Sequence, residues 1–177
     1  MILTATALPG VFIVDVERRE DERGFFARTW CQREAATAGI QLAWVQFNIS
    51  VNRRRGTLRG LHYQRAPCSE GKLVRVTRGA IWDVVVDLRS DSPTFRQHVA
   101  VTLTADDQRG LYIPPADIAH GFLTLAEDTE VLYHMSAFYS TEHATGVRWD
   151  DPAFGIVWPE PAAVISERDA QYPDFTG

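Results

Sequence analysis

The sequence predicts an all-β protein whose strands form a sandwich or a closed barrel. Two observations predict it. Apolar residues recur with a period of two, and the apolar runs are short and bounded by Gly, Pro, Ser or Asp. Many short strands at close spacing are typical of sandwiches and barrels. Strands and helices do not alternate along the chain, which disfavours a Rossmann-type nucleotide-binding fold.

The strand candidates follow one another through the middle of the chain. They are residues 72–78, 80–88, 98–103, 111–113 and 129–133. Gly79 separates the first two candidates. We expect it to form a tight turn between two paired strands, because glycine adopts a positive φ without steric cost.

One helix and one extended tail complete the expected architecture. Residues 30–38 are rich in helix formers and stop at Gly39, and glycine is common just past a helix end. Residues 151–177 contain four prolines and are expected to pack over the barrel as an extended tail with a turn or two. A chain of 177 residues is expected to form one domain spanning residues 1–177.

Composition disfavours several classes of function. The formal net charge of −5 argues against a general nucleic-acid-binding role. No apolar run approaches the roughly 20 residues needed to cross a bilayer, and no signal-peptide pattern is present. Cys31 and Cys68 are too few for a disulfide framework and are interpreted as reduced thiols. We therefore expect a cytoplasmic protein with neither a nucleic-acid nor a membrane partner.

The densest polar cluster spans residues 46–64 and contains Arg59 and His62. Residues three apart on a regular strand point to opposite faces, so these two share a cavity only if the backbone bends between them. Gly60 permits that bend. A lone strand histidine is more often a core or surface residue with a satisfied hydrogen bond. The basic run at 53–55 fits either a solvated turn or a phosphate contact.

The histidines do not predict a metal site. His62 and His120 lie in glycine-bracketed segments, but zinc usually takes three or four protein ligands, and the H-x-H and H-x-x-x-H spacings are missing. Three further candidates each have a plain structural interpretation. Tyr133 fits a barrel aromatic, Asp169 a solvated acid or a helix cap, and Lys72 a solvated lysine.

Eight segments, taken in their order and spacing, resemble the dTDP-4-dehydrorhamnose 3,5-epimerase family of 4-keto-6-deoxysugar nucleotide epimerases. The resemblance runs from about Phe12 to Asp174. The segments are RGFF at 23–26, Gln46-x-Asn48-x-Ser50, GTLRGLHYQ at 56–64, GKLVRVTRGAIWDVVVDLR at 71–89, SPTF at 92–95, AHGF at 119–122, RWDDPAFGIVWP at 148–159 and SERD at 166–169.

The resemblance implies a cupin-type jelly-roll β-barrel with short helices, which forms homodimers with shared active sites and uses no metal or organic cofactor. It implies a nucleotide-sugar substrate that is epimerised at C3, C5 or both, with dTDP-4-dehydro-6-deoxyglucose as the first candidate. His62 matches the catalytic base, Asp169 its paired acid, Tyr133 the general acid and Lys72 an active-site group near the sugar. Substrate-binding positions of the family are matched by Arg23, Phe26, Gln46, Asn48, Arg59, His120 and Tyr139.

These residue types suit proton transfer beside a ketone. Histidine is the natural base near neutral pH, and a carboxylate partner orients its ring. Inversion also requires a second group that delivers a proton to the opposite face. Two alternatives remain: a sugar-nucleotide 3,4-ketoisomerase and a non-catalytic sugar-binding cupin. Arg28 and Phe47 depart from the family pattern near the nucleoside, which leaves the nucleotide base open.

Overall fold

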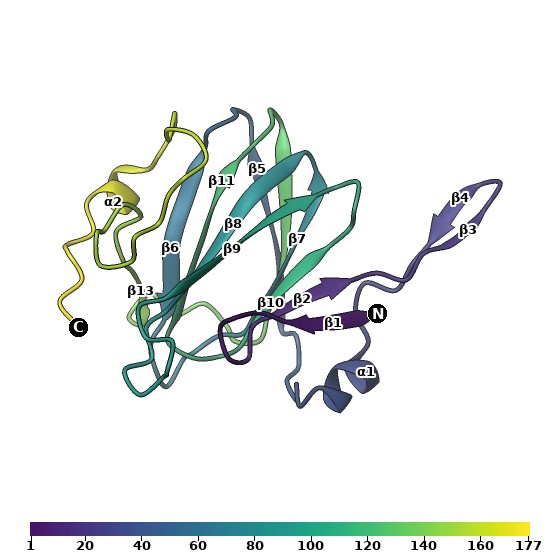
Figure 1. The fold of residues 1–177 in the computed structure, drawn as a ribbon, viewed down its shortest axis with the longest axis horizontal. Helices are drawn as coiled ribbons and strands as arrows, with labels where there is room; N and C mark the ends of the chain where they lie inside the picture. The colour runs from purple at the N-terminus through teal and green to yellow at the C-terminus, as the bar shows by residue number, and fades with distance from the viewer.

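The computed structural model describes residues 1–177 and contains two facing antiparallel sheets (Figure 1). The first sheet has the order β1 (Ile2–Ala5), β2 (Phe12–Asp15), β10 (Gly110–Ile113), β7 (Lys72–Arg78), β12 (Thr129–Met135), β5 (Gln46–Asn52). The second has the order β13 (Ala144–Gly146), β6 (Leu58–Gln64), β11 (Ile118–Thr124), β8 (Ala80–Asp87), β9 (His98–Thr104). The predicted all-β jelly-roll barrel is confirmed.

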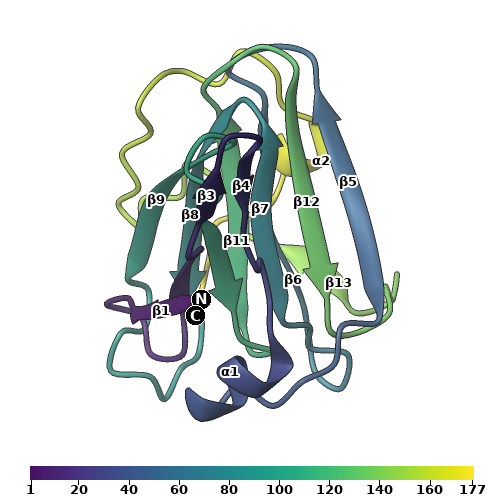
Figure 2. The ribbon, with the colours of Figure 1, turned by 90° about the vertical axis from the view of Figure 1, so that its right-hand side faces the viewer.

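A small hairpin stands away from this body. It consists of β3 (Arg19–Asp21) and β4 (Gly24–Phe26), and it projects on the side opposite the C-terminal segment (Figures 1 and 2). Phe26 at its end is 72% exposed. The hairpin therefore packs little of its apolar surface against its own chain.

β7 and β8 are joined by the expected turn at Gly79, whose φ is 78°. The expectation that these two strands pair with each other was wrong. β7 pairs with β10 and β12, whereas β8 pairs with β9 and β11. The turn instead carries the chain from one sheet to the other. A Cβ at residue 79 would lie 2.4 Å from the Thr129 Oγ1, so the turn has no room for a side chain.

The helices are short. α1 (Gln32–Thr37) confirms the predicted helix but begins after Cys31, which is extended, and it ends before Gly39, whose φ is 80°. α2 (Glu167–Ala170) interrupts the proline-rich tail, and the hydroxyl of Ser166 caps it. The tail was expected to be extended with a turn or two, so this second helix is a difference from the expectation. With six and four residues, α1 and α2 are both too short to be membrane-spanning helices.

Alternation along the strands separates the inward face of each sheet from its outward face. The inward side chains of β7, β8, β11 and β12 form the main core, which includes Val74, Val76, Ile81, Val85, Phe122 and Val131. The outward face of the second sheet packs under the C-terminal segment, where Leu61 and Val84 contact Phe154 and its neighbours. The tail thus covers the barrel as predicted. The inward positions that the apolar core leaves unfilled are polar, and they line a cavity between the sheets.

Candidate active site

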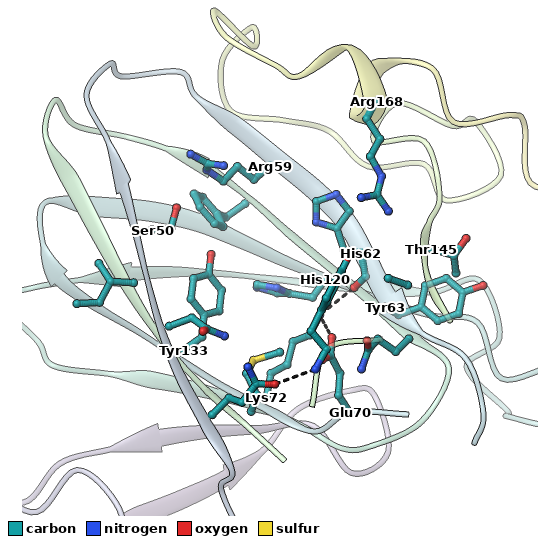
Figure 3. A pocket seen from close by; sticks show the side chains of 18 residues that line it. Ser50, Arg59, His62, Tyr63, Glu70, Lys72, His120, Tyr133, Thr145 and Arg168 are labelled. Atoms are coloured by element: carbon teal, nitrogen blue, oxygen red, sulfur yellow. Dashed lines mark hydrogen bonds and ion pairs between the residues drawn. The ribbon is translucent and has the colours of Figure 1, made fainter. Parts of the chain in front are cut away.

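A cavity of about 360 Å³ lies between the two sheets (Figure 3). This volume is within the range of small-molecule sites. The first sheet lines it with Gln46, Asn48, Ser50, Lys72, Tyr133 and Met135, and the second with Arg59, His62, Tyr63, Gln64, His120 and Phe122. Two opposed sheets therefore line the same cavity, and most of the side chains that line it are polar.

His62 is held by a carboxylate from far along the chain. Its Nε2 lies 2.8 Å from the Asp169 Oδ1, and the Asp169 Oδ2 accepts a hydrogen bond of 3.1 Å from the backbone N–H of Gly60. Burial alone would raise the pKa of Asp169, but the hydrogen bonds from His62 and Gly60 lower it below its usual value. Because Nε2 faces a carboxylate, Nδ1 is the ring nitrogen that can take a proton.

A β-bulge brings Arg59 and His62 to one cavity. His120 of β11 pairs with His62 of β6. Two residues further along β11, Phe122 pairs with Arg59, which lies three residues before His62 in β6. The strand β6 thus carries one extra residue at Gly60, whose φ is 136°. The bend that the sequence required at this glycine is confirmed.

Lys72 lies at the cavity wall with two partners. Its Nζ donates a hydrogen bond of 3.0 Å to the carbonyl oxygen of His62 and lies 3.2 Å from the Glu70 Oε1 (Figure 3). Its side chain is only 7% exposed. The plain interpretation of a solvated lysine is therefore wrong.

Tyr133 extends from β12 on the wall opposite His62 (Figure 3). Burial raises the pKa of its phenol, and the nearby Asp83 carboxylate raises it further, whereas Arg59 and a hydrogen bond with Ser50 act in the opposite direction. The phenol is therefore protonated at neutral pH, which is the form that can donate a proton.

A second histidine–carboxylate pair lies deeper in the cavity. The His120 Nε2 is 2.6 Å from the Asp83 Oδ1, and both side chains are buried. The Asp83 Oδ2 has no hydrogen-bond partner. The His120 ring lies 6.2 Å from the Tyr133 ring, and His120 is also the strand partner of His62, so this second pair borders both residues.

The structure brings most of the predicted substrate-binding residues together. Gln46, Asn48, Arg59, His120 and Tyr139 all line the cavity. The Gln46 Oε1 accepts a hydrogen bond of 2.8 Å from the backbone N–H of Tyr139, which orders the rim. The Arg59 Nε donates to the Asn52 Oδ1 at 2.7 Å, and its guanidinium group remains exposed.

Arg23 and Phe26 do not reach this cavity within the chain. Both lie on the projecting hairpin, where the Arg23 side chain is 84% exposed and pairs with Asp21. The basic run at 53–55 also lies outside the cavity. Arg55 in this run pairs with Glu160 at 2.7 Å, which favours the solvated-turn interpretation.

Sequence reasoning missed several residues of the site. Arg168 lines the cavity and bonds to the Tyr172 hydroxyl at 3.1 Å. It belongs to the SERD segment, so its neighbour Asp169 could have pointed to it. Glu70 also lines the cavity, and its spacing of two from Lys72 was the available signal. Ser50 was noted only as part of a motif.

The arrangement supports proton transfer and anion binding. A histidine with its carboxylate partner, a protonated phenol on the facing sheet and a lysine side chain surround one volume. Arg59 and Arg168 add positive charge at the rim. No group of three or more His, Cys, Asp or Glu side chains is placed to hold a metal ion, since His62 and His120 belong to separate pairs.

Comparisons with known proteins agree with this geometry. The family model described as dTDP-4-dehydrorhamnose 3,5-epimerase matches residues 5–177. An enzyme of that name from Pseudomonas aeruginosa is 43% identical over 99% of this chain and 96% of its own length. A structure of the Bacillus anthracis enzyme with TDP and PPi bound has a TM-score of 0.94 and 38% identity, and the match covers 98% of this chain and 99% of that one.

A third comparison involves a bound sugar nucleotide. The Legionella pneumophila enzyme in complex with dTDP-4-keto-L-rhamnose has a TM-score of 0.89 and 36% identity, and the match covers 97% of this chain and 90% of that one. The family model spans nearly the whole chain, and the sequence identities lie well above those at which only a fold is shared. The chain therefore belongs to the dTDP-4-dehydrorhamnose 3,5-epimerase family, whose members are isomerases.

Proposed function

We propose that this protein inverts C3, C5 or both of dTDP-4-dehydro-6-deoxyglucose by removing and returning protons beside the 4-keto group. One observation carries the proposal: His62 and Tyr133 face the same cavity from opposite sheets. A sugar ring between them presents one face to a base and the other to an acid. Such an arrangement is what stereoinversion requires, and a ketone shift within the ring does not need it.

The first step is proton removal by His62. Its Nδ1 takes the proton from the carbon next to the ketone, while Nε2 stays hydrogen-bonded to Asp169. The electron pair of the C–H bond moves to the carbonyl oxygen and forms an enolate. Asp169 remains ionised because its pKa is lowered, so its charge stabilises the imidazolium.

The enolate requires a positive group near its oxygen, and Lys72 supplies it. An ammonium fixed before the reaction needs little reorganisation as charge develops, and loss of such a donor costs about 10²–10³-fold in rate. Tyr133 then donates its proton to the carbon from the opposite face. The new C–H bond takes the electron pair back from the enolate, the ketone re-forms and the configuration is inverted.

Cationic and aromatic groups at the rim would bind the nucleotide. Arg59 and Arg168 are suited to the diphosphate, because guanidinium groups bind phosphate oxygens with paired hydrogen bonds. Tyr139 is 60% exposed at the rim and offers a face on which a base can stack. Gln46 and Asn48 provide amide groups beside it.

We further propose a homodimer in which the hairpins are exchanged. Strand β5 lies at the edge of the first sheet and exposes Phe47, Ile49 and Val51 by 62%, 63% and 51%, a row larger than a solvated surface usually carries. Arg23 and Phe26 on the hairpin could then contact substrate in the partner's cavity. Light scattering tests the dimer itself, because a dimer has twice the chain mass of 19.9 kDa.

The remaining expectations concern location and other partners. We propose a cytoplasmic protein that binds neither nucleic acid nor membranes. Cys31 and Cys68 do not form a disulfide, as is usual in a reducing compartment, and the formal net charge is −5.

An isotope experiment tests the proposed reaction. The purified protein is incubated with dTDP-4-dehydro-6-deoxyglucose in D2O, and the product is followed by NMR. We expect deuterium at C3, C5 or both, with inverted configuration at the labelled carbon. Absence of label would reject this substrate, and parallel assays with CDP- and GDP-linked 4-keto sugars then decide the nucleotide. A product with its ketone at C3 would indicate the isomerase instead.

A further inference from the structure

A carboxylate that the proposed mechanism does not use contacts Lys72, the only lysine in the chain. The Glu70 Oε1 lies 3.2 Å from the Lys72 Nζ, and the two side chains are 9% and 7% exposed. Figure 3 shows both at the end of the cavity below His62, whose carbonyl oxygen is the second partner of the Nζ. This ion pair is therefore shielded from solvent and lies at the site itself.

The backbone around Gly71 fixes this pair. Glu70 and Lys72 are two residues apart at the start of β7, and residues with this spacing on an extended chain point the same way. The Gly71 N–H donates to the Ser136 Oγ at 2.6 Å, and the Ser136 N–H donates to the Gly71 carbonyl at 2.9 Å. A Cβ at residue 71 would lie 3.0 Å from Leu42. The connection is held on both sides and has little freedom to turn.

Charge and donor geometry indicate how the Glu70 carboxylate acts on Lys72. An ammonium removed from water tends to lose its proton, and an opposite charge within about 4 Å favours the charged form. The ammonium has three N–H donors, of which Glu70 and the His62 carbonyl can occupy two. We propose that Glu70 is a positioning residue, which keeps Lys72 charged and directs its third N–H toward the ketone oxygen. This inference rests on the proposed function.

Other titratable groups face the same cavity and must be considered beside Lys72. They are Arg59, His62 and Tyr63 of β6, His120 of β11, Tyr133 of β12, Tyr139 of the following loop, and Arg168 of α2. None of them is a carboxylate. The two other acids close to the site are already paired, Asp169 with His62 and Asp83 with His120. Glu70 is thus the carboxylate that contacts this lysine.

Because the chain contains one lysine, its charge can be followed directly. Protein labelled with 13C at lysine Cε gives one lysine signal, whose chemical shift titrates with the ammonium. In Glu70→Gln the amide keeps the side-chain size but removes the charge, and we expect the titration midpoint to fall by about one pH unit or more. Glu70→Asp should restore most of the difference. Glu127→Gln, at an exposed turn residue, controls for the change in net charge and should leave the midpoint unchanged.

Enzyme kinetics test whether this charge matters for catalysis. In Glu70→Gln we expect the alkaline limb of the kcat profile to move to lower pH. The value of kcat should stay within about threefold of wild type where the lysine is still charged and fall by about 10²-fold at alkaline pH, the loss typical of a missing oxyanion donor. KM should change little. Glu70→Asp should recover the wild-type profile.

Two results would overturn the inference. An unchanged lysine midpoint in Glu70→Gln would show that the carboxylate does not hold the charge. A raised KM with an unchanged kcat profile would show that Glu70 binds substrate instead. If wild-type protein fails to exchange protons, the proposed function is rejected, while the lysine titration still decides the role of Glu70.

Discussion

Gly60 of β6 and Gly121 of β11 lie against each other across the paired strands. A Cβ on residue 60 would lie 2.5 Å from the Gly121 Cα, and a Cβ on residue 121 would lie 2.6 Å from the Arg59 carbonyl oxygen. The bulge that turns both Arg59 and His62 into the cavity occurs at this contact. The two glycines therefore control the direction of the His62 side chain, although neither of them lines the cavity.

Gly60→Ala is expected to lower both stability and activity. The added methyl group meets backbone at 2.5 Å and sits at a φ of 136°, so the strands must separate and His62 must move. A displaced catalytic group can cost about 10²-fold in rate. Gly155→Ala is the matched control, because its φ of 59° is also positive but nothing lies within 4 Å. That change should cost only about 1 kcal/mol. Urea unfolding and kcat check both, and equal losses in the two variants would contradict the argument.

His62→Asn should abolish proton exchange while leaving the fold and nucleotide binding nearly intact. Removal of a general base costs about 10²–10⁴-fold. His98→Asn is the control, since His98 bonds the Phe154 carbonyl at 3.0 Å on the outer side of the second sheet, away from the cavity. Deuterium incorporation and dTDP affinity are the measurements. Wild-type exchange in His62→Asn would remove the assigned base.

Tyr133→Phe should separate exchange from inversion. Without the phenol, His62 can still remove and return a proton on its own face, so label can enter one carbon without a change of configuration. Full inversion requires the proton from the opposite sheet and should be slowed about 10²-fold or more. NMR of the sugar in D2O reports both quantities. Inverted product at the wild-type rate would assign the acid to another residue, and His120 would be the next candidate.

Short apolar runs bounded by turn residues located the five expected strands, because these signals are local. Segments 72–78 and 98–103 match β7 and β9 to within one residue, although burial does not alternate along either strand. Pairing was harder to predict. The two strands joined at Gly79 enter different sheets, and which strands pair depends on contacts that no local pattern records.

The site was predictable only as far as the family resemblance reached. His62 and Asp169 are 107 residues apart, and nothing in their local patterns links them. Asp83 was missed because an acid in a strand has no distinctive local pattern, and the one local signal for Glu70 was its spacing of two from Lys72. Their partners become visible only when β8 meets β11 and the chain bends before β7.

Asp87 should make the protein acid-sensitive. Burial alone would raise its pKa, but hydrogen bonds from Arg89, Ser92 and Thr94 hold the pKa well below its usual value. A carboxyl whose pKa is lowered on folding stabilises above its unfolded pKa of about 3.9, and this contribution is lost as pH falls toward the folded value. The stabilisation that Asp87 contributes should therefore be about 1 kcal/mol smaller at pH 3 than at neutral pH.

Asp87→Asn tests this directly. The variant should unfold about 3 kcal/mol more easily at pH 7, because Arg89 loses its buried partner, and the gap from wild type should narrow at pH 3. Asp91→Asn, an exposed acid in the same loop, is the control and should change little. Urea unfolding at both pH values is the measurement. A difference in unfolding free energy between variant and wild type that stays constant or widens in acid would contradict the lowered pKa of Asp87.

Shared active sites can be tested by mixing two defective variants. Phe26→Ala should impair the hairpin and His62→Asn the cavity, and each alone should be poorly active. In a mixed dimer, the cavity with an intact His62 receives an intact hairpin from its partner. Half of the dimers in an equal mixture are mixed, and each has one complete site, so unfolding and refolding the two together should restore about a quarter of wild-type activity. Refolding each variant separately before mixing is the control. No gain in the co-refolded sample would mean that the hairpin serves its own chain or no site at all.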